Sequence, residues 1–563
     1  MRGLPIAALF AAAVPLAWLL PNHYLPWPAA WLEGAALALL FVAAVLVRHP
    51  AGLPLRWALP VVVALLSIAW QAASGRILFS GDAVMAALYV AAFLLAIGCG
   101  AALQGAAPSG RGGFVEVWAG MLALAAVVSG VIALLQWTGV YSHWLLMADL
   151  PPGARPFGNL AQANHMCTAA FLGLCAMLLL REGGRIGVAA WAVVSGLLVF
   201  TMVMTGSRTG WLQMGALLLM AGALAGRTGS RIALWQVAAM VAGYGLLALA
   251  WPTLNDGLLL SGQRPVAQQW SGGGRELLWP ALWDAVWRHP VSGYGWQQVV
   301  LAQLEVATDH PAVGVHFETA HNLVLDLLLW AGVPAGGTIA MAAVIALGLH
   351  LARLREARAL WLLCGVVGVA AHSMLELPLH FAYFLAPVGL ALGAAFALEG
   401  VGQDAGERPR TLRVPGPALA GAGALLGALF VLIAIDYLVV EQNHRVLRLE
   451  SARIGVLRLE TPAPQVRLLD QQQAFLEFAR REARPGMTAD ELEAMRRASH
   501  RFAYPGSLLR YALAAGLNGR PEEARLTLRR LCRVHPQRRC DEAREAWSAL
   551  RSQHPGLPEV KLP

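Results

Sequence analysis

The stretch AVMAALYVAAFLLAIGCGAALQ, residues 83–104, contains no charged side chain. A helix of this length rises about 30 Å, which matches the hydrocarbon core of a bilayer. Comparable apolar runs of roughly 17 to 23 residues recur from the N-terminus to about residue 439. The sequence therefore predicts an all-α polytopic membrane protein with about thirteen transmembrane helices. The predicted spans are 4–20, 29–47, 54–72, 83–104, 114–137, 166–180, 186–203, 209–225, 232–251, 334–352, 359–375, 379–398 and 416–439.

The composition excludes a protein that consists only of soluble domains. Hydrophobic residues make up 58% of the 563 residues, charged residues make up 13%, and the mean hydropathy is +0.57. Membrane lipids are therefore the expected surroundings, and no nucleic-acid partner is expected. No small-residue cleavage site follows the first apolar run, and the next run begins within ten residues, so we expect the first run to be retained as a span.

The arginines predict the orientation of the chain. With the N-terminus in the cytoplasm, the short outer loops hold only Arg76, Arg155 and Arg208. The short inner loops hold many more, including Arg48, Arg56, Arg181, Arg185, Arg227, Arg231, Arg353, Arg355 and Arg358. This asymmetry follows the positive-inside rule. An odd number of spans then places the C-terminus outside.

The composition changes near residue 440, where a charged region begins that carries most of the formal net charge of +9. We expect a transmembrane domain at 1–439, with a large outer loop at 252–333, and a soluble helical domain at 440–563. Residues 511–536 resemble a tetratricopeptide-type helical hairpin. One such hairpin cannot bury its own apolar face, so it must pack on helices at about 463–502 or on a partner. A small helical cap without a ligand is the alternative.

Two of the six cysteines lie in this outer region. Cys532 and Cys540 flank a His-Pro turn, and an oxidising compartment would permit a disulfide between them. His535 alone does not complete a zinc site, so no metal is expected there. The other four cysteines lie in spans and are interpreted as apolar fillers.

Four polar blocks are predicted to lie on the outer face. The first block holds Arg155, Asn159, Gln162, Asn164 and His165 just before the sixth span. Amides both donate and accept hydrogen bonds, so this density suits a surface that binds hydroxyls or phosphates. A helix cap with an interfacial turn is the alternative.

The second and fourth blocks also follow span ends. Arg208 lies in the turn TGSRTGW, where it could meet an anion, pair with a partner in the helix bundle or extend to the lipid headgroups. Glu376 lies in HSMLELPLH, where it could orient a histidine, bind an acceptor group or pair with an arginine.

The third block is the long loop. Arg275 follows the glycine-rich segment 271–274 and begins a predicted helix whose Trp279, Trp283 and Trp287 are four residues apart. Free N–H groups at such a helix start favour a phosphate, whereas the tryptophans could equally rest in the membrane interface. The loop ends in Thr319-Ala320-His321-Asn322-Leu323, and a histidine there is not needed to span a bilayer.

These segments carry a family resemblance. GNLAQANH, TGSRTGW, GRELLWPALWDAVWRHPVSGYGW, TAHNLVLDLLLWAGVPAG and HSMLELPLHFAYFL follow in this order between about residues 150 and 385. Together they resemble the bacterial O-oligosaccharyltransferases that glycosylate pilins and other exported proteins, within the superfamily of O-antigen ligases and polymerases. The soluble tail is similar to the protein-glycosylating branch.

The resemblance implies a GT-C-like membrane enzyme of the bacterial inner membrane. Such an enzyme transfers a preassembled glycan from undecaprenyl diphosphate to a hydroxyl of an exported, pilin-like protein on the periplasmic face, without metal or nucleotide cofactor. His321 matches the essential histidine of the family's HN motif, so we expect it to act as the general base; a phosphate-binding imidazolium and a structural part are the alternatives.

Elementary chemistry supports the same assignment. A serine or threonine hydroxyl is a weak nucleophile and needs a positioned base to take its proton. The reaction is expected to invert the configuration at the anomeric carbon. A departing diphosphate needs fixed positive charge, for which Arg208 and Arg275 are the candidates. Arg155, Asn159, Gln162, Asn164, His165, Asn322 and Glu376 are expected to hold the donor head group or the loops around it.

Two alternatives stay open at this point. Ligation to lipid A core, or polymerisation of O-antigen units, would use the same donor with a different acceptor. A transporter would instead place polar groups near the membrane midplane in matched, broken halves, whereas the polar blocks here lie at outer span ends.

Overall fold

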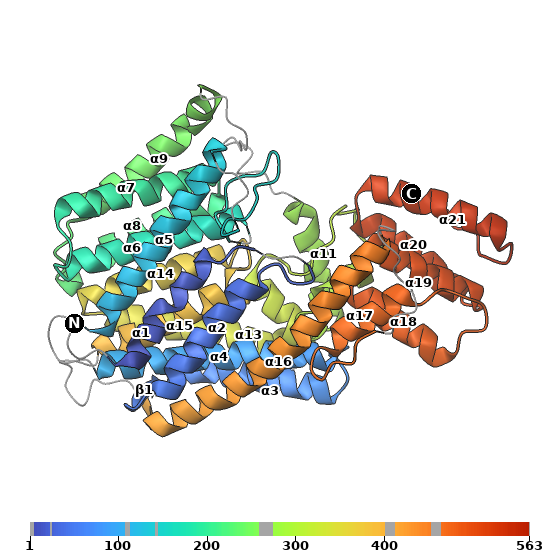
Figure 1. The fold of residues 1–563 in the computed structure, drawn as a ribbon, viewed down its shortest axis with the longest axis horizontal. Helices are drawn as coiled ribbons and strands as arrows, with labels where there is room; N and C mark the ends of the chain where they lie inside the picture. Colours follow the sequence, from blue (N-terminus) through green and yellow to red (C-terminus); the bar gives the residue numbers. More distant parts are fainter. Residues whose placement is uncertain are drawn as a thin grey trace. The chain divides into compact units, whose positions relative to one another are not determined.

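A computed structural model describes residues 5–22, 25–106, 113–140, 145–160, 162–257, 274–399, 411–451 and 463–561. These residues are mostly helical (Figure 1). The elements up to the long loop are α1 (Ile6–Ala13), η1 (Val14–Leu19), α2 (Ala30–Leu46), β1 (Ala51–Pro54), α3 (Leu55–Ala73), α4 (Ser80–Gly105), α5 (Phe114–Thr138), α6 (Ala163–Glu182), α7 (Val188–Met204), α8 (Arg208–Thr228) and α9 (Leu234–Gly257). The remaining elements are α11 (Arg275–Arg288), α12 (Val299–Val306), α13 (Leu323–Arg353), α14 (Ala357–His372), η2 (Pro378–His380), α15 (Ala382–Glu399), β2 (Thr411–Val414), α16 (Gly416–Ser451), α17 (Asp470–Arg480), α18 (Ala489–Arg501), α19 (Pro505–Leu517), α20 (Pro521–Val534) and α21 (Gln537–Gln553).

The predicted membrane helices are confirmed. In the described part of the chain, 9 helices are long and apolar enough to cross a membrane, and four shorter apolar helices occupy the other predicted spans. The protein is therefore an all-α, multi-pass membrane protein. The first predicted span, 4–20, begins one residue outside the described range.

The chain divides into two compact units. The first unit comprises Met1–Val61, Leu88–Ser271 and Met341–Val431, and the second comprises Val62–Ala87, Gly272–Ala340 and Leu432–Pro563. The last segment of the second unit begins at Leu432, near the predicted boundary at residue 440, but the same unit also includes two earlier segments of the chain, and the predicted boundary stays a prediction. Polar contacts within the second unit explain the grouping: Asp470 accepts hydrogen bonds from the backbone of Ser80 and Gly81, and Arg501 forms a bidentate ion pair with Asp82.

The core of the first unit is α6. Of its most apolar window, 94% is buried, and it packs against α5, α7, α8 and α14. A helix that is apolar all round and buried in this way belongs in the centre of a bundle. A short antiparallel sheet in the same unit pairs β1 with β2, from Ala51 opposite Val414 to Pro54 opposite Thr411.

Helix α13 is broken once, at Gly332, where φ is 75° and ψ is 172°. A side chain there would collide with the carbonyl oxygen of Val291, so the position needs glycine. The loop segment before α12 satisfies the open backbone groups, because the N–H groups of Tyr294 and Gly295 donate to the carbonyls of Leu329 and Trp330. The predicted span at 334–352 is therefore preceded by a helical segment that starts at Leu323.

The C-terminal helices of the second unit pack in sequence. Helices α19 and α20 form a hairpin where the tetratricopeptide-type hairpin is predicted, and Tyr511 and Ala514 pack on residues of α17 and α18. Of the two possibilities, packing on the preceding helices or on a partner, these contacts correspond to the first. Thr488 and Glu491 form a capping box that starts α18. Residues 452–462 of the predicted outer domain lie outside the described residues.

Candidate active site

His321 lies in the second unit, between α12 and α13, and its backbone is left-handed with φ 53°. Left-handed conformations are uncommon for non-glycine residues and persist only where the surroundings impose them. The side chain is partly exposed. This combination of an imposed backbone and an accessible imidazole is what a positioned general base requires.

The peptide groups on both sides of Ala320 are held in place. The Ala320 N–H donates to Oδ1 of Asp326 at 2.7 Å, and its carbonyl oxygen accepts a hydrogen bond from the indole N–H of Trp279 at 2.8 Å. Asp326 lies in the first turn of α13 and Trp279 in the second turn of α11. Two helices therefore fix the residue that immediately precedes His321.

Asn322 caps helix α13. Its Oδ1 accepts hydrogen bonds from the backbone N–H groups of Val324 at 3.1 Å and Leu325 at 3.2 Å. Asparagine is among the preferred residues for this position because its short side chain satisfies open donors of the first turn. The structure thus shows that Asn322 Oδ1 caps the helix, and the substrate contact of Asn322 stays a prediction.

Arg275 is the first residue of α11 and follows Gly274, whose φ is 84°. An arginine at a helix N-terminus adds its charge to the positive end of the helix dipole, an arrangement that suits a bound anion. Because Trp279 lies one turn further along α11, the helix that begins at Arg275 also holds the loop of His321. The glycine-rich residues 271–273 lie outside the described residues.

The two other tryptophans of α11 lie on its outward face. Trp283 is 48% exposed and Trp287 is 58% exposed, and their rings meet edge to face at 6.0 Å. Trp279, by contrast, donates a hydrogen bond to the His321 loop. Their exposure favours the membrane-interface alternative.

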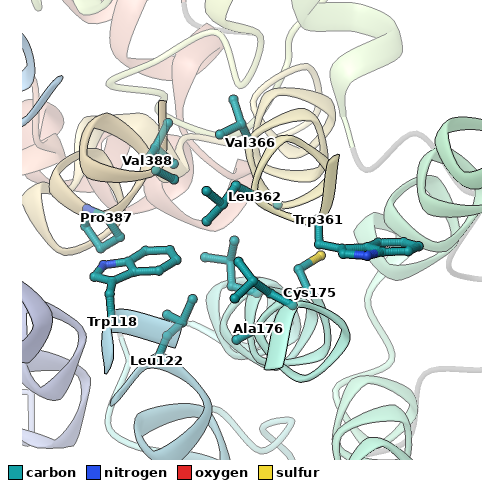
Figure 2. A pocket seen from close by; sticks show the side chains of 13 residues that line it. Trp118, Leu122, Cys175, Ala176, Trp361, Leu362, Val366, Pro387 and Val388 are labelled. Carbon is teal, nitrogen blue, oxygen red and sulfur yellow. The ribbon is translucent and has the colours of Figure 1, made fainter. Parts of the chain in front are cut away.

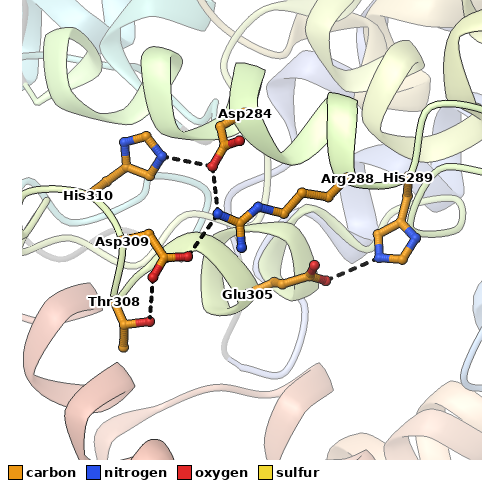
Figure 3. Close-up of polar contacts among 7 residues, drawn as sticks. All are labelled: Asp284, Arg288, His289, Glu305, Thr308, Asp309 and His310. Atoms are coloured by element: carbon orange, nitrogen blue, oxygen red, sulfur yellow. Dashed lines mark hydrogen bonds and ion pairs between the residues drawn. The ribbon is translucent and has the colours of Figure 1, made fainter.

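Ion pairs tie α11 to the segment after α12 (Figure 3). Arg288 Nη2 lies 2.7 Å from Oδ2 of Asp284 and 2.8 Å from Oδ2 of Asp309, and His310 Nε2 lies 2.9 Å from the same Asp284 oxygen. Hydrogen bonds from His310 and Arg288 hold the pKa of Asp284 below its usual range. These pairs are exposed, so each adds little stability, but together they fix the α11–α12 hairpin.

A separate group of predicted site residues lies in the first unit, at the start of α6. Asn164 Nδ2 donates to Oε1 of Glu376 at 3.0 Å. His165 is fully buried, with Nδ1 2.7 Å from the Tyr383 hydroxyl and Nε2 3.0 Å from Nε2 of Gln162. The fold therefore brings together four residues predicted from two distant segments.

Sequence reasoning missed the polar side chains one turn deeper. Thr168 Oγ1 lies 2.7 Å from Nδ1 of His372 and accepts a hydrogen bond from Nε2 of Gln213 at 2.8 Å. All three residues are fully buried. Thr168 follows His165 by three residues and shares its helix face, which is the signal that could have identified it.

Asn159 supports the loop before α6. Its Oδ1 accepts from the Ala148 N–H at 2.9 Å, and its Nδ2 donates to the carbonyls of Leu19 at 2.7 Å and Leu146 at 2.8 Å. The side chain is fully buried. Of the two expected parts, holding the donor head group or holding the loop around it, the structure supports the second.

Arg155 and Arg208 lie at one turn. Arg155 Nη1 donates to the carbonyl oxygens of Thr205 at 2.9 Å and Gly206 at 3.2 Å. Ser207 then caps α8, which begins at Arg208. Arg155 thus fixes the turn that presents Arg208 at a helix N-terminus, where a guanidinium and the helix dipole both favour an anion.

The first unit also encloses an apolar cavity between α5, α6, α14 and α15 (Figure 2). Its lining includes Trp118, Leu122, Cys175, Trp361 and Pro387. The described residues that line it include no Asp, Glu, His, Lys or Arg. This cavity therefore offers no group for acid-base or phosphate chemistry.

Comparison with known proteins identifies the class of enzyme. The family model described as O-antigen ligase matches residues 192–340, and the model described as virulence factor membrane-bound polymerase, C-terminal, matches residues 359–550. The first match contains Arg208, Arg275 and His321, and the second contains Glu376. The chain is therefore similar to O-antigen ligases and to membrane-bound polymerases over these two regions.

Two curated relatives are similar to the chain. It is 28% identical over 541 residues to the general O-oligosaccharyltransferase of Acinetobacter baylyi, which covers 94% of this chain and 92% of that protein. It is 29% identical over 268 residues to the ComP-specific O-oligosaccharyltransferase of the same organism, over 47% of this chain and 48% of that protein. The chain is thus similar over most of its length to a bacterial O-oligosaccharyltransferase, which supports a glycosyltransferase-type enzyme over a transporter.

Proposed function

We propose that the protein transfers a preassembled oligosaccharide from undecaprenyl diphosphate to serine or threonine hydroxyls of exported proteins, such as a pilin. The proposed site is the periplasmic face of the bacterial inner membrane, with the N-terminus in the cytoplasm and the C-terminal domain in the periplasm. A protein acceptor is supported by the similarity to two O-oligosaccharyltransferases, one general and one specific for ComP. The observation that carries the proposal is the left-handed backbone of His321, whose neighbour Ala320 is held by Trp279 and Asp326.

The proposed reaction is a single displacement. His321 takes the proton of the acceptor hydroxyl, and the hydroxyl oxygen forms a bond to the anomeric carbon of the glycan. The bond between that carbon and the diphosphate oxygen breaks, and the electron pair leaves with undecaprenyl diphosphate. The configuration inverts because one attack occurs from the side opposite the leaving group.

Fixed positive charge would stabilise the departing diphosphate. Arg275 at the start of α11 and Arg208 at the start of α8 are the proposed ligands, since planar guanidinium groups bind phosphate oxygens in pairs. Asn164, Glu376, Gln162 and His165 are proposed to support donor binding in the first unit, with Arg155 holding the turn before Arg208. We expect transfer to persist after chelation of divalent metal ions.

A gene deletion tests the acceptor class. Mass spectrometry of exported proteins should show glycosylated serine or threonine peptides in the parent strain and bare peptides in the deletion strain, with lipopolysaccharide unchanged. Loss of glycan from lipopolysaccharide alone would instead identify a ligase to lipid A core. Shortened glycan chains on an unchanged set of acceptors would identify a polymerase.

A further inference from the structure

The loop that carries His321 rests on the C-terminal helices of the same unit. The N–H of Gly314 donates to the carbonyl oxygen of Arg533 at 3.3 Å. The ring of His316 stacks on that of His535, with centroids 5.7 Å apart and planes 22° apart, and meets Tyr504 edge to face at 6.0 Å. The loop is therefore held by one backbone bond and by two aromatic contacts.

The turn that carries His535 is itself fixed from several sides. His535 Nε2 lies 2.8 Å from the carbonyl oxygen of Ala503. Cys532 and Cys540 form a disulfide across the turn, and both pack in one apolar cluster with Val300 and Leu304 of α12. Such a turn is a rigid support, because covalent and apolar contacts both restrict it.

The support continues from His316 to His321. Gln303 of α12 donates from Nε2 to the Val315 carbonyl at 2.8 Å and accepts at Oε1 from the Phe317 N–H at 2.9 Å. The Phe317 ring then meets the His321 ring edge to face, with centroids 5.4 Å apart and planes 88° apart. One contact after another thus joins the disulfide-bonded turn to the proposed base.

We propose that His316 is a positioning residue: its ring, stacked on His535, transmits the rigidity of the disulfide-bonded turn to the His321 loop. This inference rests on the proposed function of His321. The C-terminal helices would then contribute to the reaction and would not serve only as a small helical cap. Without the stack of His316 on His535, the His321 loop loses one of its contacts with these helices. The reaction rate falls steeply when the base is displaced, because proton transfer depends on the position of the base relative to the acceptor hydroxyl.

His316 acts through its ring rather than through its nitrogens. Within the described residues, Nε2 of His316 has no hydrogen-bond partner. Burial lowers the pKa of both His316 and His535 to about 4, so both rings are neutral near pH 7 and stack without mutual repulsion. The His316→Phe variant should therefore keep the positioning of the loop, because it keeps an aromatic ring. The His316→Ala variant should lose it.

The test uses the full-length enzyme, the lipid-linked oligosaccharide extracted from the parent strain, and the acceptor protein that the deletion experiment identifies. His316→Ala should lower kcat about tenfold or more with the donor KM within about twofold, and His316→Phe should restore most of kcat. His500→Ala is the matched control, since His500 is another half-buried histidine of these helices that meets Tyr511 rather than the loop. It should leave kcat near that of the wild type.

A second variant keeps the test decisive if His316→Ala does not fold. His535→Ala removes the other ring and should lower kcat similarly, and the His316→Ala/His535→Ala double variant should be no slower than the slower single variant. Wild-type kcat in both alanine variants would overturn the inference, as would inactive His316→Phe. The His321→Ala variant distinguishes failure of this inference from failure of the proposed function. If it is inactive while His316→Ala and His535→Ala have normal activity, the inference fails and the proposed function stands.

Discussion

The indole N–H of Trp279 donates a hydrogen bond to the carbonyl oxygen of Ala320 at 2.8 Å, and Ala320 immediately precedes His321. Through this bond the helix that begins at Arg275 also fixes the proposed base. Arg275, a proposed diphosphate ligand, and His321, the proposed base, lie in the same unit of the chain. The hydrogen bond between Trp279 and Ala320 links the helix of the first to the loop of the second.

Trp279→Phe should lower kcat because it removes the indole N–H and keeps an aromatic ring. Loss of one such hydrogen bond costs about 1 kcal/mol, which corresponds to a roughly fivefold lower rate if the bond holds the base in place. Steady-state transfer kinetics measure the effect. Trp283→Phe is the matched control on the same helix, because that side chain is 48% exposed. Equal rates for both variants would show that the bond does not position the loop.

Asn322→Ala should destabilise the start of α13, because two backbone donors lose their acceptor. The expected loss is about 1 kcal/mol of unfolding free energy, whereas Asn322→Asp should keep the cap. Thermal unfolding of the purified protein in detergent compares the variants. Activity that is lost in Asn322→Asp with stability retained would favour the substrate contact over the cap.

Arg275→Lys and Arg208→Lys should each impair transfer, because an ammonium lacks the planar fork that binds two phosphate oxygens. We expect a decrease of about 10- to 100-fold in kcat with unchanged thermal stability. Arg288→Lys is a suitable control, since that arginine pairs with Asp284 and Asp309. Normal rates in both test variants would place the diphosphate site elsewhere.

Stability should fall as the pH falls from about 6.5 to about 4. The folded-state pKa values of His316 and His535 are both lowered to about 4 by burial, so in this range the unfolded chain binds more protons than the folded chain. The stabilisation is complete above the ordinary histidine pKa and is lost as the pH approaches 4. The thermal midpoint measured across this range should decrease less steeply in His316→Phe. An identical slope in that variant would contradict the burial of His316.

Much of the fold could be predicted from the sequence because the bilayer restricts the solutions. A span must be apolar and about 20 residues long, so a run such as 83–104 identifies its own helix, here α4 (Ser80–Gly105). The break of α13 at Gly332 could not be predicted, since its backbone groups are satisfied by Tyr294 and Gly295 of the long loop. Nothing near Gly332 in the sequence indicates that partner.

The candidate site could be predicted only in part. Polar residues at span ends identified Asn164, His165 and Glu376, and the structure joins Asn164 to Glu376. Gln213 and His372 were not singled out, because their partners lie on other helices and their burial depends on tertiary packing. Asn159 and Asn322 have the polarity of ligand-binding residues but bind backbone groups, a distinction that composition alone does not make.

The most direct test of the central claim is the initial rate of glycan transfer by purified His321→Ala at saturating donor and acceptor. General-base catalysis contributes about 10²- to 10⁴-fold, so the rate should fall by at least the lower figure while the thermal midpoint and donor binding stay near those of the wild type. A rate within a few fold of the wild type, from a variant shown to be folded, would contradict His321 as the base.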